Sequence, residues 1–191
     1  EVIITTGGST AANALTISSL ISGGAGSLTK AGTGLLVLSG ASTYTGATNI
    51  NQGTVQLSGT TVSLGANSNV TLRQGATLDL NAAGATATNW SNALAPAPRV
   101  LIGALAGTGT VVNTNAAPAV LRITSSANGT MNGLINQTAG AITLVKEGTG
   151  TQSLTGLNNY TGPTVIRGGV LAVNALANIG QDSSIGRGNV A

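Results

Sequence analysis

The sequence predicts an all-β fold, a parallel β-solenoid in which short strands coil around a narrow core. One observation is a repeat, because the stretch from Leu28 to Leu57 returns without a gap as Leu144 to Val173. A second is that alternating runs such as Thr54-Val55-Gln56-Leu57 are cut by glycine every few residues, and no window keeps helical spacing for three turns. Strands this short cannot enclose a core alone. Each coil must therefore stack on the next and pair its backbone groups there.

The repeat divides the chain into two related units, at about 20–73 and 134–187. Because the units are expected to stack, residues 1–191 should form one continuous solenoid domain, with the matching residues Tyr44 and Tyr160 at the same corner of the coil. The pattern breaks at 81–98, which holds the single Trp and two of the four Pro. Proline cannot donate into a strand ladder, so this segment is expected to leave the coil as an irregular loop.

Side-chain alternation along the strands predicts which residues point into the core. Leu36 and Leu38 of the first copy, and Leu154 of the second, are expected to point inward. Gln152 stands where the first copy has Leu36, so it should face the core as well. It then needs hydrogen-bond partners there, because an unpaired buried amide costs about 1–3 kcal/mol.

The two copies share the motif Lys-x-Gly-x-Gly-x-x-x-Leu-[Ser/Thr]-Gly-x-x-x-Tyr-Thr-Gly-x-Thr-x-Ile-x-x-Gly, which begins at Lys30 and again at Lys146. This motif resembles the autotransporter-associated β-strand repeat of bacterial passenger domains and related giant surface proteins. The resemblance implies a right-handed β-helix that is secreted or displayed at a Gram-negative-type, outer-membrane surface, usually as a stalk or adhesin. The chain departs from the pattern at Thr151-Gln152-Ser153, where the family and the first copy have apolar residues.

The composition is unusual for a globular protein. The hydrophobic fraction is 41%, but aromatic residues make up only 2% of the chain and charged residues only 6%, against about 25% charged in a typical domain. A thin core with room for little beyond Val, Leu, Ile and Ala explains the shortage of aromatics. There is no cysteine, and no apolar run approaches the roughly 20 residues that span a bilayer. Binding to nucleic acid is not expected, because stacking aromatics are missing.

Fold alone does not decide function, and many parallel β-helices cleave polysaccharides, so the acidic residues bear on whether this chain is an enzyme. The four acidic residues are Glu1, Asp79, Glu147 and Asp182, and there is no histidine. A glycosidase needs two carboxylates about 5–9.5 Å apart. We expect Asp79 to face outward alone and Glu147 to be a solvated charge, so no catalytic pair forms. With neither Cys nor His, and without acidic calcium-binding loops, no metal site is predicted. No glycine-rich turn opens a helix, so no cofactor site is predicted either.

Two candidate binding features remain. The seven basic residues recur at intervals close to one coil, which would align them in a stripe for an acidic polysaccharide or lipopolysaccharide: Lys30, Arg73, Arg99, Arg122, Lys146, Arg167 and Arg187. The alternative is that seven charges scattered along the chain are spaced this way by chance. Trp90 could form a glycan contact in the 81–98 loop, or it could fold back and cover an apolar gap.

The sequence therefore predicts a non-enzymatic, extracellular structural β-solenoid, a stalk, adhesin or filament segment. The alternative is a polysaccharide-binding or polysaccharide-degrading module that uses the Trp90 loop. The chain starts at Glu1 within a repeat and is interpreted as a piece of a longer exported product. Open coil edges at both ends favour end-to-end self-association or continuation in a longer polypeptide.

Overall fold

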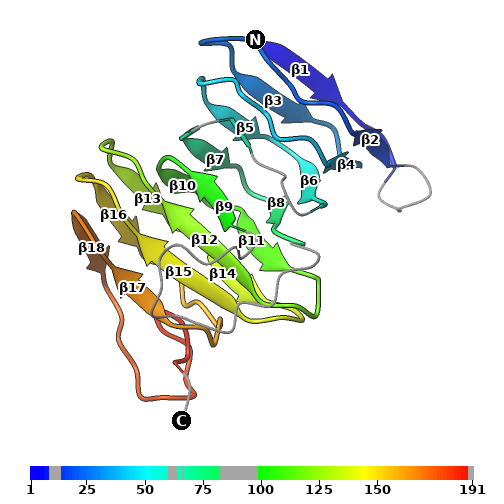
Figure 1. Cartoon of the computed structure of the whole chain (residues 1–191). Coiled ribbons are helices and arrows are strands. Elements are labelled where there is room, and N and C mark those ends of the chain that lie inside the picture. Colours follow the sequence, from blue (N-terminus) through cyan, green and yellow to red (C-terminus); the bar gives the residue numbers. More distant parts are fainter. Residues whose placement is uncertain (9–13, 60–63, 66, 82–98, 189–191) are drawn as a thin grey trace.

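The structure is a computed structural model that describes residues 1–8, 14–59, 64–65, 67–81 and 99–188. These residues form three sheets, in which every strand pairing is parallel (Figure 1). Sheet 1 contains β1 (Val2–Thr5), β3 (Leu28–Ala31), β5 (Thr48–Ile50), β7 (Val70–Leu72), β10 (Leu105–Gly107), β13 (Gly129–Met131), β16 (Thr151–Leu154) and β18 (Val170–Val173). Sheet 2 contains β2 (Leu15–Ile17), β4 (Leu35–Leu38), β6 (Gly53–Leu57), β8 (Ala76–Asp79), β11 (Thr110–Asn113) and β14 (Leu134–Gln137). Sheet 3 contains β9 (Arg99–Ile102), β12 (Ala119–Ile123), β15 (Ile142–Lys146) and β17 (Thr164–Ile166).

The chain visits the three sheets in rotation, so each coil has three sides. From β7 to β16 the strands fall in sheets 1, 2 and 3 in strict order, and each strand pairs with the equivalent strand of a neighbouring coil. Only β9, which begins sheet 3, and β14, which ends sheet 2, have a described partner on one side alone. The predicted all-β parallel solenoid is therefore confirmed. The coils stack from the N-terminal end to the C-terminal end of the molecule (Figure 1).

The core consists of aliphatic rows that run from coil to coil. In sheet 2 the register places five residues in one row, all with no solvent exposure: Leu36, Val55, Leu78, Val111 and Ile135. Each such side chain contributes about 1.5–3 kcal/mol on burial. The predicted inward positions of Leu36, Leu38 and Leu154 are confirmed, since each is at most 1% exposed.

Gln152 faces the core, as predicted, and its amide is fully paired. Strands β10 and β13 share a single register pair, Gly107 with Met131, so the backbone of Leu105 lacks a ladder partner in β13. Gln152 reaches across the coil at Gly129 instead. Its Oε1 accepts from the Leu105 N–H at 3.0 Å, and its Nε2 donates to the Leu105 carbonyl at 2.8 Å. The side chain replaces the two missing ladder bonds.

Replacing Gln152 with leucine should therefore destabilise the protein, although it restores the residue type of the first copy. Both backbone groups of Leu105 would lose their partners, which should lower the free energy of unfolding by about 1–3 kcal/mol. Chemical denaturation measures the change, with the exposed Gln181→Leu as the matched control. A more stable Gln152→Leu protein would contradict the bridging role of the amide.

The two tyrosines have the same surroundings but not the same corner, so that prediction is wrong. Tyr44 follows β4 of sheet 2 and precedes β5 of sheet 1, whereas Tyr160 follows β16 of sheet 1 and precedes β17 of sheet 3. Between β3 and β15 the chain completes four turns and two further sides. The second copy is therefore rotated by one third of a turn relative to the first, because the interval between the copies is not a whole number of coils.

Both tyrosines are buried, and each hydroxyl forms a 2.7 Å hydrogen bond, Tyr44 with Thr48 and Tyr160 with Thr164. Burial raises the pKa of Tyr160 to about 12 and also raises the pKa of Tyr44. The neutral phenol thus favours the folded state. This contribution is present below about pH 10, the pKa of an unfolded tyrosine, and is lost as the pH rises toward about 12.

We therefore expect alkaline titration to lower the stability of the protein between about pH 10 and pH 12, by about 1.4 kcal/mol per pH unit for Tyr160. Tyrosinate absorbance measures ionisation of the phenols, and circular dichroism measures unfolding in the same titration. The absorbance signal comes from two tyrosines, because the chain contains only Tyr44 and Tyr160. Tyr160→Phe should flatten the pH dependence. Ionisation of both phenols near pH 10 in a protein that remains folded would contradict the expectation.

Candidate functional site

The two motif lysines lie in the interior, although the sequence placed them in a surface stripe. Lys30 is 0% and Lys146 is 1% exposed. The Nζ of Lys30 donates to the carbonyls of Ala31 at 2.8 Å and Gly32 at 2.6 Å, in its own turn, and to that of Gln52 at 3.2 Å, in the next coil. Burial lowers the pKa of both lysines.

Lys146 repeats this arrangement in the second copy, donating to the carbonyls of Glu147 at 2.6 Å, Gly148 at 3.1 Å and Gly168 at 3.3 Å. We call each of these arrangements a lysine clip, because one ammonium group joins the turns of two coils. The motif glycine Gly169 leaves room for it, since a Cβ there would lie 2.7 Å from the Lys146 Nζ. The prediction that Lys30 and Lys146 belong to a surface stripe is therefore wrong. The glycine turns fold over their side chains.

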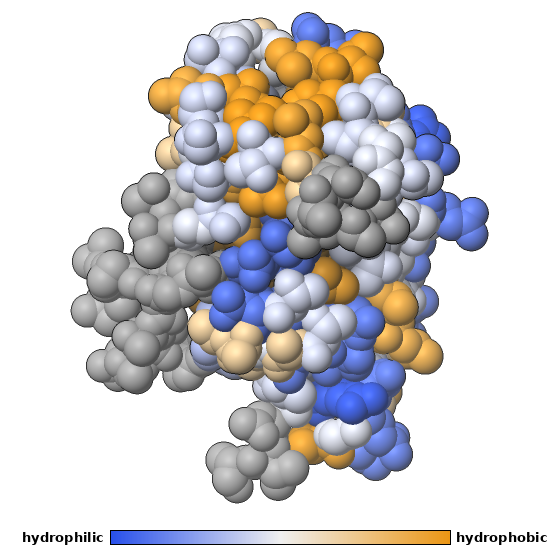
Figure 2. Space-filling view, turned by 90° about the vertical axis from the view of Figure 1, so that its right-hand side faces the viewer, coloured by the Kyte–Doolittle hydropathy of each residue, from blue (hydrophilic) through white to orange (hydrophobic). Residues whose placement is uncertain are grey.

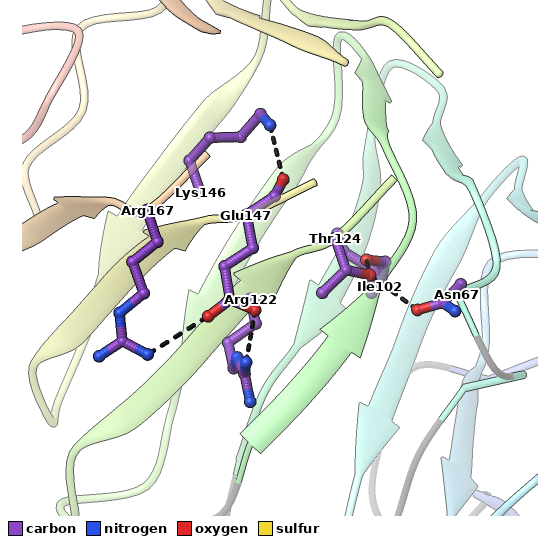
Figure 3. Close-up of polar contacts among 7 residues, drawn as sticks. All are labelled: Asn67, Ile102, Arg122, Thr124, Lys146, Glu147 and Arg167. Carbon is purple, nitrogen blue, oxygen red and sulfur yellow. Dashed lines mark hydrogen bonds and ion pairs between the residues drawn. The ribbon is translucent and has the colours of Figure 1, made fainter. Parts of the chain in front are cut away.

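Three arginines are paired with acids. Glu147 accepts from Arg122, in the preceding coil, and from the Nη1 of Arg167 at 3.3 Å, in the following coil (Figure 3). Near the C-terminal end, Arg187 pairs with Asp182. The expectation that Glu147 is simply a solvated charge is wrong, because parallel stacking brings it between two arginines. Charges of alternating sign attract, so this part of sheet 3 is not a row of repelling cations.

Arg73 is the exception among the basic side chains that the structure describes, since it is exposed and paired with no acid. Its Nε donates to the Oδ1 of Asn51 at 3.1 Å. Arg99 begins β9, and its side chain lies outside the described residues. Arg73 follows a strand of sheet 1, whereas Arg122 and Arg167 lie on the side of sheet 3, so the structure does not gather the seven residues into one stripe.

Asp79 is buried, which corrects the expectation that it faces outward alone. It is 2% exposed, and its carboxylate accepts from Gln56 Nε2 at 2.8 Å, from the Thr114 hydroxyl at 2.6 Å and from the Thr114 and Asn81 backbone N–H groups at 3.1 Å. The turn after β11 in the next coil closes over it. Asp79 therefore ties coils together and is held in place by its donors.

The remaining acid, Glu1, accepts from the hydroxyl of Thr29 at 2.7 Å. In the parts of the chain that the structure describes, no three His, Cys, Asp or Glu residues gather where they could hold a metal ion. Trp90, the candidate glycan contact, and residues 82–98 of the predicted loop lie outside the described residues. The described residues form strands and turns, and they include no helix that is long and apolar enough to cross a membrane.

A shallow groove opens where sheet 1 turns toward sheet 2. It has a volume of about 510 Å³ and crosses three successive coils. Its lining comes from the ends of β7 and β10 and from the turns after β5, β7 and β10: Asn51, Gln52, Thr71, Leu72, Arg73, Gln74, Gly107 and Thr108. We call it the Arg73 groove. From sequence, Arg73 is predicted only as a member of the stripe, because its neighbours in adjacent coils are distant in sequence.

Exposed apolar side chains lie on the edge strands and in the neighbouring loops at the two ends of the solenoid. At the N-terminal end they include Val2, Ile3 and Leu15, and Figure 2 shows an apolar area at this end, at the top of the view. At the other end they are Leu134, Leu157, Ile166, Val170, Val173, Leu176 and Ile179. Stacking buries the partners of some of these residues in the next coil, such as Leu28 opposite Val2 and Leu36 opposite Leu15.

Comparison with known proteins agrees with this architecture. The family model described as passenger-associated-transport-repeat matches the chain twice, at 28–57 and 144–173, which are the two copies of the repeat. The chain therefore belongs to the passenger-type β-solenoids that carry autotransporter-associated repeats.

One relative covers nearly the whole chain. Over 177 residues, this chain is 35% identical to the adhesin BmaC autotransporter of Brucella suis biovar 1 (strain 1330). The alignment covers 92% of this chain and 5% of that much longer protein. No solved structure matches the chain significantly. The repeat and the relative together assign the chain to a secreted or cell-surface protein of a Gram-negative bacterium.

Proposed function

We propose that this chain is a rigid, non-enzymatic segment of an extracellular adhesin, which holds binding regions away from the bacterial surface. The observation that carries the proposal is the unbroken sheet 1, in which eight parallel strands run from β1 to β18. At about 4.8 Å per strand this sheet extends about 34 Å along the solenoid axis. Aliphatic rows, lysine clips and the Asp79 cluster join its coils, as a stiff spacer requires.

The two ends support a place within a longer solenoid. Among the described residues, edge strands β1 and β18 have a strand partner on one side only, and they carry exposed apolar side chains such as Ile3 and Val170. Such edges pair with further strands. Stacking on neighbouring coils of the same polypeptide would cover both features, and end-to-end association of separate copies would cover them equally.

A replacement experiment in the full-length adhesin tests the spacer role. We expect exchange of this segment for an unrelated β-solenoid with the same number of coils to preserve bacterial adhesion, whereas deletion should reduce it. Loss of adhesion in the exchanged protein, despite normal surface display, would show that the segment itself carries essential contacts.

Incubation of the chain with acidic and neutral polysaccharides tests the non-enzymatic assignment. The carboxylates of Asp79, Glu147 and Asp182 are each held by hydrogen bonds or ion pairs, which supports a structural role for them. No new reducing ends or unsaturated products should appear. Release of either product would support the polysaccharide-degrading alternative.

A further inference from the structure

We propose that the Arg73 groove binds the carboxylate-bearing sugars of an acidic polysaccharide. The proposal goes beyond the spacer role, because it assigns a ligand to a particular surface of the segment. It depends on how the structure distributes positive charge, on the chemistry of the groove lining and on the orientation of one guanidinium group.

The charge distribution leaves Arg73 as the available cation. Among the described side chains, the two lysines donate to backbone carbonyls in the interior, and Arg122, Arg167 and Arg187 are paired with acids. Arg73 is exposed, and no acidic residue lines its groove. An anion that approaches this corner therefore meets a positive charge without a competing carboxylate.

The guanidinium group is held in a productive orientation. Asn51 accepts from the Nε of Arg73 at 3.1 Å, and the two terminal nitrogens donate to no other described residue. The edge formed by Nη1 and Nη2 is therefore free for two parallel hydrogen bonds. A planar carboxylate matches that edge, which is the geometry of strong arginine–carboxylate pairs.

The rest of the lining suits a sugar. Gln74, next to Arg73 in the same turn, and Gln52, in the turn of the preceding coil, are both exposed, and their amide groups can both donate to and accept from hydroxyl groups. Thr108 adds an exposed hydroxyl, and Gly107 beside it has no side chain that would fill the groove. A volume of about 510 Å³ lies within the range of small-molecule sites.

This chemistry favours an acidic glycan over other anions. No Trp, Tyr or Phe lines the groove, so nucleic-acid bases have no stacking surface. The groove also lacks the deep apolar pocket that anchors a protein partner. A sugar acid, by contrast, offers one carboxylate surrounded by hydroxyl groups, which matches one guanidinium surrounded by amides and a hydroxyl.

The test is a binding titration of the whole chain at low salt. The probes are oligogalacturonate, a hyaluronan oligosaccharide and a sialylated oligosaccharide, with methyl-esterified oligogalacturonate as the uncharged counterpart. We expect at least one carboxylated probe to bind. Arg73→Gln should weaken its binding roughly tenfold or more, the effect of losing hydrogen bonds to a charged group. Esterification should weaken binding as well, and so should added salt.

Two further variants make the result specific. Arg187→Gln removes the same charge at a site outside the groove and should leave the affinity unchanged. Asn51→Ala keeps the charge but removes the group that orients it, and should give an intermediate loss. Unfolding curves establish that each variant is folded.

Four outcomes would overturn the proposal. One is that none of the three carboxylated probes binds, and another is that Arg73→Gln binds as tightly as the unmodified chain. A third is an equal loss in Arg187→Gln, which would indicate a response to net charge alone. The fourth is loss of binding in Trp90→Ala but not in Arg73→Gln, which would assign the contact to the 81–98 segment.

Discussion

Replacing Gly107 with alanine is expected to lower the free energy of unfolding by about 3–5 kcal/mol, one of the largest effects of a single methyl group in this chain. Gly107 has a φ of 109°, a conformation that residues with a side chain rarely adopt. A Cβ at this position would lie 1.9 Å from the carbonyl oxygen of Leu72 in the adjacent coil. The added methyl group would therefore force β7 and β10 apart.

Gly75 provides the matched control for the Gly107 substitution. Its φ of 77° is also positive, but a Cβ there would meet no atom within 4 Å. Gly75→Ala should therefore cost only the backbone strain, about 1–2 kcal/mol. Denaturation and amide hydrogen exchange in β7 and β10 measure the difference. Equal losses in the two variants would mean that close approach of the coils adds nothing to the backbone strain.

Lys30→Met is expected to destabilise the protein by about 2–4 kcal/mol, although methionine fills nearly the same volume. The substitution removes the ammonium group that donates to the carbonyls of Ala31, Gly32 and Gln52. The surrounding aliphatic side chains offer these carbonyls no other donor. The clip lies beneath a turn in a narrow solenoid. Water can therefore reach some of these carbonyls after the substitution, which keeps the expected loss below the sum of three buried hydrogen bonds.

The second lysine clip serves as an internal replicate of this experiment. Lys146→Met should cost a similar amount, because Lys146 contacts the same three kinds of carbonyl. Arg187→Met removes one positive charge from an exposed ion pair and should change stability much less than either lysine variant does. Thermal and chemical denaturation of the three variants compare these effects. If both lysine variants are as stable as the control, the clips do not hold the coils together.

The local pattern of the sequence was sufficient to predict the parallel solenoid and the inward positions of Leu36, Leu38, Leu154 and Gln152. Alternation along a strand has a period of two residues, so it can be read from neighbouring positions alone. The repeat of 28–57 at 144–173 further indicated that the chain is built from similar units that stack on one another. The resemblance to passenger repeats, which the family match agrees with, also came from this local motif.

The tertiary structure decided what depends on contacts between coils. The interval between the copies, which contains the segment at 81–98, sets the rotation of one third of a turn that separates Tyr44 from Tyr160. Turns of neighbouring coils bury Lys30 and Asp79, although the sequence predicts both at the surface. Stacking also brings Glu147 between two arginines and leaves Arg73 open beside Gln52 and Gln74. Side-chain alternation carries no information about which turn lies above another, because that is set by the number of residues in every intervening coil.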